Sequence, residues 1–223
     1  MYLKQWSTIA VVLCLIFTPA ISSAAPETAA PVVQNSSSPM QLVQKRVNSI
    51  IDVLNDAQLG KPENRTAQRD KIWGIANMMF DFDEISRRTV GNKWTAFSDA
   101  EKKQFTDIFA RFLYNTYIEK VEGEYSSEKI AADRISWDKE LIKGDRALVR
   151  TRLLRASAQL PIDYKMQNKD GEWKIYDILV ENGVSIVQNY RVQFKSILEK
   201  ETPAQLIVKL QKKLDNQQSQ SKN

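Results

Sequence analysis

The sequence predicts an α+β fold, in which helices pack against an antiparallel sheet. Two patterns in the 223 residues lead to this prediction. Apolar residues recur with helical spacing from about residue 39 to residue 117, and again after residue 185. Between these regions, apolar and polar residues alternate, which is typical of strands with one buried face. Helices that are segregated from an antiparallel sheet define the α+β class.

Three helices are predicted in the first part of the folded chain. The first begins at Pro39 after the N-cap Ser38, and Gly60 ends it. The second covers about residues 64–78, and a short third helix covers residues 80–88. Because the apolar residues of each segment fall on one side of a helix, each helix is expected to bury one face.

The clearest helix follows Ser98, which forms a capping box with Glu101. Its apolar stripe is unusually aromatic and consists of Phe105, Ile108, Phe109, Phe112, Leu113 and Tyr117. Such a stripe usually belongs to a packed core. An aromatic helix that lies over a sheet without closing on it would instead line an apolar cavity. Periodicity does not distinguish these two interpretations.

Three strands are predicted at residues 146–155, 160–167 and 172–180. The last two are joined by a hairpin turn at residues 168–171, with the sequence Asn-Lys-Asp-Gly. One face of this sheet is apolar, and it includes Ala147, Val149, Thr151, Leu153, Leu160, Ile162, Tyr164 and Met166.

The first 24 residues have the pattern of a secretory signal peptide. Lys4 precedes an apolar run at residues 9–17, and small residues follow as far as Ala24, where cleavage is expected. The run is too short to span a bilayer, which needs about 20 apolar residues. A lipoprotein signal that uses Cys14 is the alternative, but the residues before Cys14 are not small.

The remaining chain is predicted to hold one folded domain at residues 39–214. A flexible lead-in rich in Ala, Pro and Ser precedes it at residues 25–38, and a polar tail follows at residues 215–223. Two helices, at about 185–199 and 203–214, complete the domain.

Removal of the leader would leave a chain without cysteine or histidine, since Cys14 is the only cysteine and there is no histidine. This composition excludes disulfides, Cys/His zinc sites and nucleophilic systems that need histidine. The formal net charge of +5 becomes +4 without Lys4. In an exported protein, this mild positive charge favours anionic lipid headgroups or acidic protein partners over nucleic acid.

Asp81, Asp83 and Glu84 form the only tight acidic cluster close to aromatic residues. Paired carboxylates can perform acid–base catalysis or hold a hard metal ion. Negative charge at the start of a helix is the simpler interpretation, and we favour it.

Tyr164, Tyr176 and Asp177 lie on predicted strands. A tyrosine and an aspartate inside a cone-shaped α+β barrel could transfer protons as in an isomerase. Packing of the rings, with the hydroxyl groups at the rim, is the favoured alternative.

Arg146, Arg150 and Arg152 share one face of a predicted strand. They could form a solvated sheet surface or a dock for an acidic partner or a phosphate, which suits the planar guanidinium group. The sequence leaves both interpretations open.

Three segments, at residues 80–94, 98–117 and 171–194, together resemble a known family. These are the periplasmic phospholipid-binding proteins of the Mla (maintenance of lipid asymmetry) pathway, also called toluene-tolerance auxiliary proteins. The resemblance covers about residues 40–210 and departs at Asn182, in a loop after the last predicted strand.

The resemblance implies a helical layer on a curved antiparallel sheet of the nuclear transport factor 2-like (cystatin-like) type, with a deep apolar pocket. It also implies a soluble, monomeric periplasmic carrier that is not an enzyme and needs neither cofactor nor metal. Such carriers exchange phospholipid between an outer-membrane lipoprotein complex and an inner-membrane ABC transporter complex. An isomerase or dehydratase on the same fold, and an exported interaction module without a ligand, are the alternatives.

The pocket is expected where apolar residues converge on the segments that resemble the family's pocket walls. The predicted lipid-binding residues are Phe105, Phe109, Phe112, Ile162, Tyr164, Met166, Ile175, Val184 and Val187. The predicted partner-docking residues are Arg146, Arg150 and Arg152.

Overall fold

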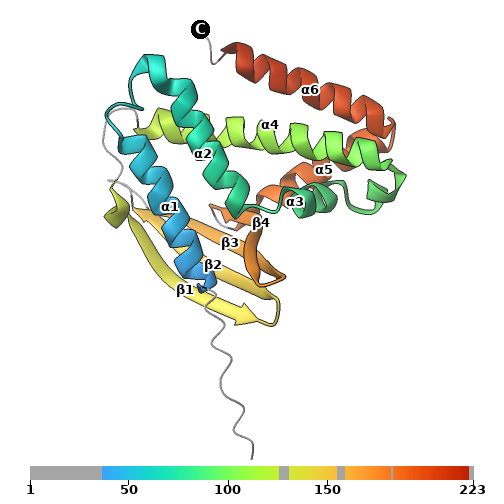
Figure 1. Ribbon diagram of the computed structural model, residues 1–223. Helices are drawn as coiled ribbons and strands as arrows, with labels where there is room; N and C mark the ends of the chain where they lie inside the picture. Colours follow the sequence, from blue (N-terminus) through green and yellow to red (C-terminus); the bar gives the residue numbers. More distant parts are fainter. Residues whose placement is uncertain (1–36, 126–130, 155–158, 182, 221–223) are drawn as a thin grey trace, which may run out of the picture. The chain divides into compact units, whose positions relative to one another are not determined.

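The structure is a computed structural model that describes residues 37–125, 131–154, 159–181 and 183–220. Among these residues, it consists of helices and one open antiparallel sheet, which confirms the predicted α+β class (Figure 1). The signal peptide and most of the lead-in predicted at residues 1–38 lie outside the described residues.

The helices begin within a few residues of the positions that the sequence pattern predicts, and α4 and α6 extend further than predicted. They are α1 (Pro39–Asn55), α2 (Arg65–Met79), α3 (Phe82–Val90), α4 (Asp99–Tyr125), α5 (Ile186–Leu198) and α6 (Pro203–Gln220). Short 3-10 turns lie at Pro62–Asn64, Gly91–Ala96 and Ala132–Arg134. The predicted capping box of α4 is present, because Glu101 N donates to Ser98 Oγ over 3.3 Å and Ser98 N donates to Glu101 Oε2 over 2.9 Å.

The sheet has the strand order β1-β2-β3-β4-β5, and all neighbours are antiparallel. The strands are β1 (Ile135–Lys143), β2 (Arg146–Leu154), β3 (Gln159–Lys169), β4 (Glu172–Val180) and β5 (Val184–Ser185). The sequence pattern predicted β2, β3 and β4 and missed the two edge strands. A register shift between Trp137 and Lys139 breaks the alternation of β1, and β5 has only two residues.

One face of the sheet packs against α1 and α2. The buried residues there form a cluster that we call the sheet core, which consists of Val43, Met79, Ala147, Val149, Met166, Trp173 and Ile175. The opposite face of β4 contacts α3 and α5. We call this opposite face the outer face of the sheet.

A second cluster, which we call the helical core, joins α3, α4, α5 and α6. Its centre is aromatic: Phe105, Phe109, Tyr190 and Phe194 meet with ring centroids 5.1–5.8 Å apart. Phe80, in the link between α2 and α3, packs against both cores. The fold therefore has two cores rather than one.

The predicted polar tail is partly helical, because α6 extends to Gln220. Leu214 is buried in the helical core, and Gln217 Nε2 donates to Thr116 Oγ1 on α4 over 2.8 Å. Contact with α4 thus holds a polar segment in a helix that its composition alone did not predict.

Candidate functional site

Several apolar residues pack against one of the two cores and are only half-buried. Those packed against the helical core include Phe112 and Tyr117 of α4 and Ile186 of α5. Those packed against the sheet core include Ile75 of α2, Tyr164 of β3 and Ile178 of β4. We call these six residues the intercluster layer. Figure 1 shows their elements: α2 and α4 lie above the sheet strands β3 and β4.

Partial burial changes the pKa of the two tyrosines in the intercluster layer. Burial raises the pKa of Tyr164 to about 12, although a hydrogen bond with Thr151 acts in the opposite direction. Burial also raises the pKa of Tyr117 to about 12, with a smaller effect from Tyr190. Both side chains are half-buried rather than buried.

The nine residues predicted to line the pocket do not all meet at one place. Phe112, Ile162 and Tyr164 are half-buried, so they remain available to a ligand. The buried ones divide between the two cores: Phe105, Phe109 and Val187 belong to the helical core, and Met166 and Ile175 belong to the sheet core. Val184 is 54% exposed on β5.

The packing of α4 accounts for this division. Phe105 and Phe109 are 0% and 1% exposed because α5 supplies Tyr190 and Phe194 as neighbours. The aromatic stripe therefore fills a helix–helix interface instead of pointing toward the sheet. Ile75, Tyr117, Ile178 and Ile186 were not predicted as site residues, and no local pattern separates them from core residues.

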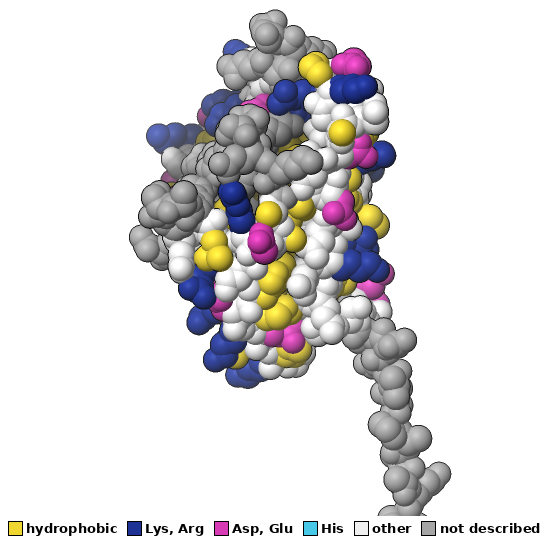
Figure 2. Space-filling view, turned by 90° about the vertical axis from the view of Figure 1, so that its left-hand side faces the viewer, with side chains coloured by type: hydrophobic (Ala, Val, Ile, Leu, Met, Phe, Trp, Pro, Cys, Tyr) yellow, Lys and Arg dark blue, Asp and Glu magenta, His cyan; other side chains and the backbone are white. Residues whose placement is uncertain are grey.

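The predicted basic strand carries acidic neighbours. Arg146, Arg150 and Arg152 lie on the outer face of β2, as expected from their spacing. Arg150 pairs with Asp163 at 3.3 Å, and Arg152 pairs with Asp138 at 2.6 Å. On the neighbouring face that carries α1 and β1, Figure 2 shows basic and acidic side chains interspersed around hydrophobic ones.

Hydrogen bonds from Arg152 and Ser136 lower the pKa of Asp138 to about 2. Arg146 donates to Gln167 Oε1 over 2.8 Å and lies 3.6 Å from Asp145. The three arginines are therefore brought together, but each has polar partners within the sheet.

The three residues of the predicted acidic cluster have different surroundings in the structure. Asp81 caps α3, because its Oδ1 accepts a hydrogen bond from Glu84 N over 3.0 Å. Glu84 accepts hydrogen bonds from Arg87 and Arg88 over 2.7 Å each. Asp83 is exposed. Among the described residues, no group of three or more acidic, cysteine or histidine side chains could hold a metal ion. The helix-terminus interpretation is confirmed for Asp81.

Asp81 also joins α3 to the hairpin of β3 and β4. Its carboxylate is paired with Lys169 and accepts a hydrogen bond from Gln167 over 2.9 Å. Burial by itself would raise the pKa of Asp81, but hydrogen bonds from Lys169, the Glu84 amide and Gln167 outweigh it, and the pKa is lowered. Asp81 should therefore stabilise the fold above about pH 4, and this contribution is lost as the pH falls.

Replacing Asp81 by asparagine is expected to lower the free energy of unfolding by about 2 kcal/mol near neutral pH. The difference from wild type should shrink as the pH falls from about 5 to about 3, since protonation removes the same charge from wild type. Urea denaturation across this range measures both quantities. Asp83→Asn is the control. If the loss in free energy of unfolding caused by Asp81→Asn does not change with pH, the proposed role of the Asp81 charge is wrong.

The structure does not bring Tyr164 and Asp177 together. Tyr164 faces the sheet core, whereas its neighbour Lys165 points to the outer face and pairs with Asp177 at 3.3 Å. Asp177 accepts hydrogen bonds from Ser185 Oγ over 2.7 Å and from Val187 N over 3.1 Å. It therefore fixes the start of α5, and the proton-transfer pair considered for an isomerase lies on two opposite faces.

No helix among the described residues is both long and apolar enough to cross a bilayer.

Comparisons with known proteins agree with the sequence resemblance. The family model for the MlaC protein matches residues 44–212. The intermembrane phospholipid transport system binding protein MlaC of Haemophilus influenzae is 25% identical over 217 residues, which are 94% of this chain and 92% of that protein. The toluene tolerance protein ttg2D of Pseudomonas putida is 28% identical over 154 residues, which are 67% of this chain and 69% of that protein.

A solved structure shares the fold. It is the phospholipid-binding protein of Ralstonia solanacearum in complex with a phospholipid, with a TM-score of 0.66 and 18% identity. The match covers 81% of this chain and 99% of that chain. Since the family model spans most of the described domain, this chain belongs to the MlaC family.

Proposed function

We propose that this protein is a periplasmic phospholipid carrier that holds the acyl chains of its cargo in the intercluster layer. It exchanges phospholipid between an outer-membrane lipoprotein complex and an inner-membrane ABC transporter complex, and it performs no catalysis. Membership in the MlaC family supports this proposal, as do the names of two relatives. The absence of histidine, and of cysteine after the predicted leader, supports a binding role over an enzymatic one.

The observation that carries the proposal is the division of the interior into two cores, which meet at Phe80. Each core is closed by its own side chains, while apolar residues at their borders keep accessible surface. Single-domain proteins normally bury such residues in one continuous core. Two apolar layers suit a ligand made largely of hydrocarbon.

The energetics of a carrier require such an enclosure. Two acyl chains contain about 30 methylene groups, and each one costs about 0.8 kcal/mol in water, so exposed chains would cost about 20 kcal/mol or more. A bilayer offers the same apolar environment as the protein. The free energy of transfer of the acyl chains from a bilayer to the protein therefore need only be near zero. A generic lining of aliphatic and aromatic side chains meets this requirement. The headgroup needs few specific contacts.

The proposal is tested by incubating the mature chain, residues 25–223, with donor vesicles that contain a labelled phospholipid. After separation from the vesicles, the protein should carry the label and deliver it to unlabelled acceptor vesicles. A protein that takes up no label, or that never releases it, is not a carrier.

Charge reversal at Arg150 and Arg152 tests the proposed dock on the outer face. The double variant Arg150→Glu/Arg152→Glu should slow transfer from purified membrane complexes about tenfold, because it removes the charge that steers encounter with an acidic partner. Bound phospholipid should remain at the wild-type level. Lys212→Glu/Lys213→Glu, on the exposed side of α6, changes the net charge equally and serves as the control. Equal slowing by both variants would reject a specific dock.

A further inference from the structure

The strand β1 is an edge of the sheet, because the strand order is β1-β2-β3-β4-β5 (Figure 1). It forms its ladder with β2, and in the part of the chain that the structure describes no other element forms backbone hydrogen bonds with it. In an antiparallel ladder, every second residue of an edge strand directs its N–H and C=O groups away from its neighbour. These backbone groups of β1 are therefore available to a further strand.

The regular part of this edge is the run of residues 139–143. A register shift between Trp137 and Lys139 interrupts the strand before it. Two apolar side chains in the run are exposed, Leu141 at 42% and Ile142 at 53%. Successive residues of a strand point to opposite faces, so one apolar side chain lies on each face. Figure 2 shows the side of the molecule that carries α1 and β1, with hydrophobic side chains at its surface.

Basic residues lie opposite each other across β1 and β2. Lys139 is paired in register with Arg150, and Lys143 with Arg146, on the outer face of the sheet. Like charges directly opposite each other destabilise a sheet. Both arginines belong to the dock proposed above, and they have acidic neighbours, because Arg150 pairs with Asp163 at 3.3 Å and Arg146 lies 3.6 Å from a carboxylate oxygen in the preceding turn. The lysines add positive charge at the open edge.

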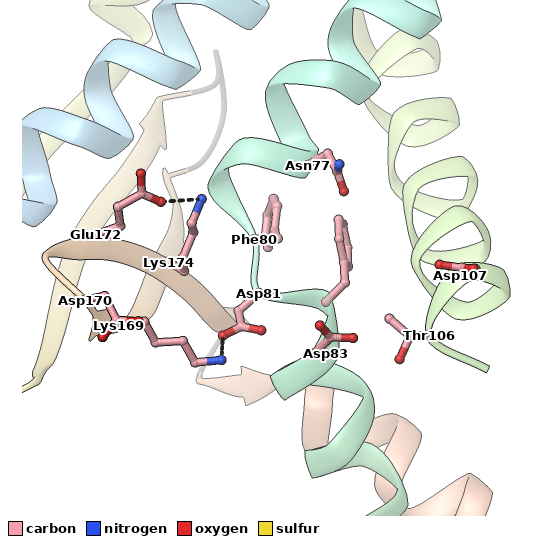
Figure 3. Close-up of a pocket in the computed structure, with 11 residues that line it drawn as sticks. Asn77, Phe80, Asp81, Asp83, Thr106, Asp107, Lys169, Asp170, Glu172 and Lys174 are labelled. Carbon is pink, nitrogen blue, oxygen red and sulfur yellow. Dashed lines mark ion pairs between the residues drawn. The ribbon is translucent and has the colours of Figure 1, made fainter. Parts of the chain in front are cut away.

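These two lysines differ from the other lysines of the sheet. Each lysine of β3 and β4 has a carboxylate within 3.3 Å, as Figure 3 shows for two of them; the pairs are Lys165 with Asp177, Lys169 with Asp81, and Lys174 with Glu172. Lys139 and Lys143 are exposed, and neither has an ion-pair or hydrogen-bond partner among the residues that the structure describes. The unpaired lysines of the sheet therefore lie on its open edge.

Lysine on an edge strand commonly protects a sheet against pairing with another copy. The charges here fit that role toward a second copy of this chain. If two copies paired antiparallel over the whole run, Lys139 of each would lie opposite Lys143 of the other. Protection alone, however, requires neither a row of arginine behind the lysines nor the exposed side chains of Leu141 and Ile142 between them. An acidic strand from a different protein avoids the repulsion and is complementary to both features.

We propose that the edge of β1 binds an extended acidic segment of a partner protein, which adds a strand to the sheet. Lys139 and Lys143 lie four residues apart on one face, so the segment carries carboxylates four residues apart, with an apolar residue midway to cover Leu141. Another apolar residue covers Ile142 on the opposite face. Backbone hydrogen bonds supply the affinity, and the side chains set the specificity. The site is separate from the acyl-chain site, because no residue of the intercluster layer lies on β1.

The probe is the acetylated and amidated peptide Ser-Glu-Val-Val-Thr-Glu-Ser, which is titrated into the isotope-labelled mature chain and followed by NMR. Its two glutamates fall on one face of a strand. Saturable shifts of the amide signals of residues 139–143 are expected, with no lipid required. The matched peptide Ser-Glu-Val-Val-Glu-Thr-Ser has the same composition and charge, but its glutamates fall on opposite faces. It should bind about fivefold more weakly or worse.

Lys139→Gln/Lys143→Gln should weaken binding of the first peptide about fivefold or more, because both ion pairs with the peptide are lost. Lys212→Gln/Lys213→Gln, on the exposed side of α6, removes the same charge and is the matched control. It should change the affinity less than about twofold, because distant surface charges are screened by salt. All four lysines are exposed, so both double variants should fold.

Methylation of alternate peptide amides distinguishes strand addition from simple charge attraction, because each methyl group removes an N–H donor. Two methylated forms of the first peptide are compared, one for each set of alternate amides. One form should fail to bind, and the other should retain its affinity, because only one set of amides faces β1. No saturable binding, equal weakening by both lysine double variants, or equal affinities of the two methylated forms would overturn the proposal.

Discussion

Replacing Ile178 by glutamate is expected to reduce the phospholipid that co-purifies with the mature protein about tenfold or more. A carboxylate beside acyl chains costs several kcal/mol, and each 1.4 kcal/mol is about a factor of ten in affinity. Ile178 is half-buried at the edge of the sheet core, so the fold should survive the substitution. Lipid phosphate per mole of protein, measured after organic extraction, gives the result.

Val192→Glu is the control for this variant. Val192 is 61% exposed on α5, so the same change of side chain there should leave both the bound lipid and the thermal stability unchanged. If Ile178→Glu retains a full complement of phospholipid with its circular dichroism spectrum intact, the acyl chains do not lie in the intercluster layer.

Replacing Phe109 by alanine should have the opposite pattern of effects. Phe109 is 1% exposed and lies 5.1–5.4 Å from the rings of Phe105, Tyr190 and Phe194. Its loss should lower the free energy of unfolding by about 3–5 kcal/mol, because a large cavity opens in the helical core. The protein that remains folded should keep its lipid. Urea denaturation and lipid extraction are measured on the same sample.

Phe112→Ala is the companion variant, one turn further along α4. Phe112 is half-buried and contacts Tyr190 at the longer centroid distance of 6.0 Å. The Phe112→Ala protein should lose less stability than the Phe109→Ala protein, and it should lose more of its bound lipid. A Phe109→Ala protein of normal stability that has lost its lipid would place Phe109 in the pocket and contradict the two-core account.

Elements with strong local signals were predictable from the sequence. The capping box at Ser98, the helix starting at Pro39 and the hairpin turn at residues 168–171 depend on neighbours within a few positions. In the turn, Asp170 and Gly171 both have positive φ, which the Asp-Gly pair tolerates. Such features depend mainly on local contacts and little on tertiary ones.

Elements that depend on distant partners were not predictable in the same way. The strand β1 has a broken alternation and is held by its ladder with β2. The end of α6 is held by α4 through Gln217 and Thr116. The end of α6 has the polar composition of a tail, and β1 lacks a regular alternation, so long-range pairing determines the structure of both.

For the candidate site, too, the sequence predicted which residues are apolar but not which elements they pack against. The stripe on α4 predicted an apolar face correctly. Spacing did not reveal that Phe105 and Phe109 are buried against α5 while Phe112 and Tyr117 are only half-buried. Likewise, Tyr164 and Asp177 are both on strands, and only the pairing of Lys165 with Asp177 shows that they face opposite sides. Which residues close a core and which leave it open depends on the partner element.

The central claim is that phospholipid is bound between the two cores. Its most direct test is denaturing mass spectrometry of an organic extract from the mature protein, purified from the periplasm without detergent. The account predicts phospholipid in a fixed ratio to protein, with at least one molecule per chain. Protein released intact and folded, with no phospholipid in its extract and none taken up from added vesicles, would contradict it.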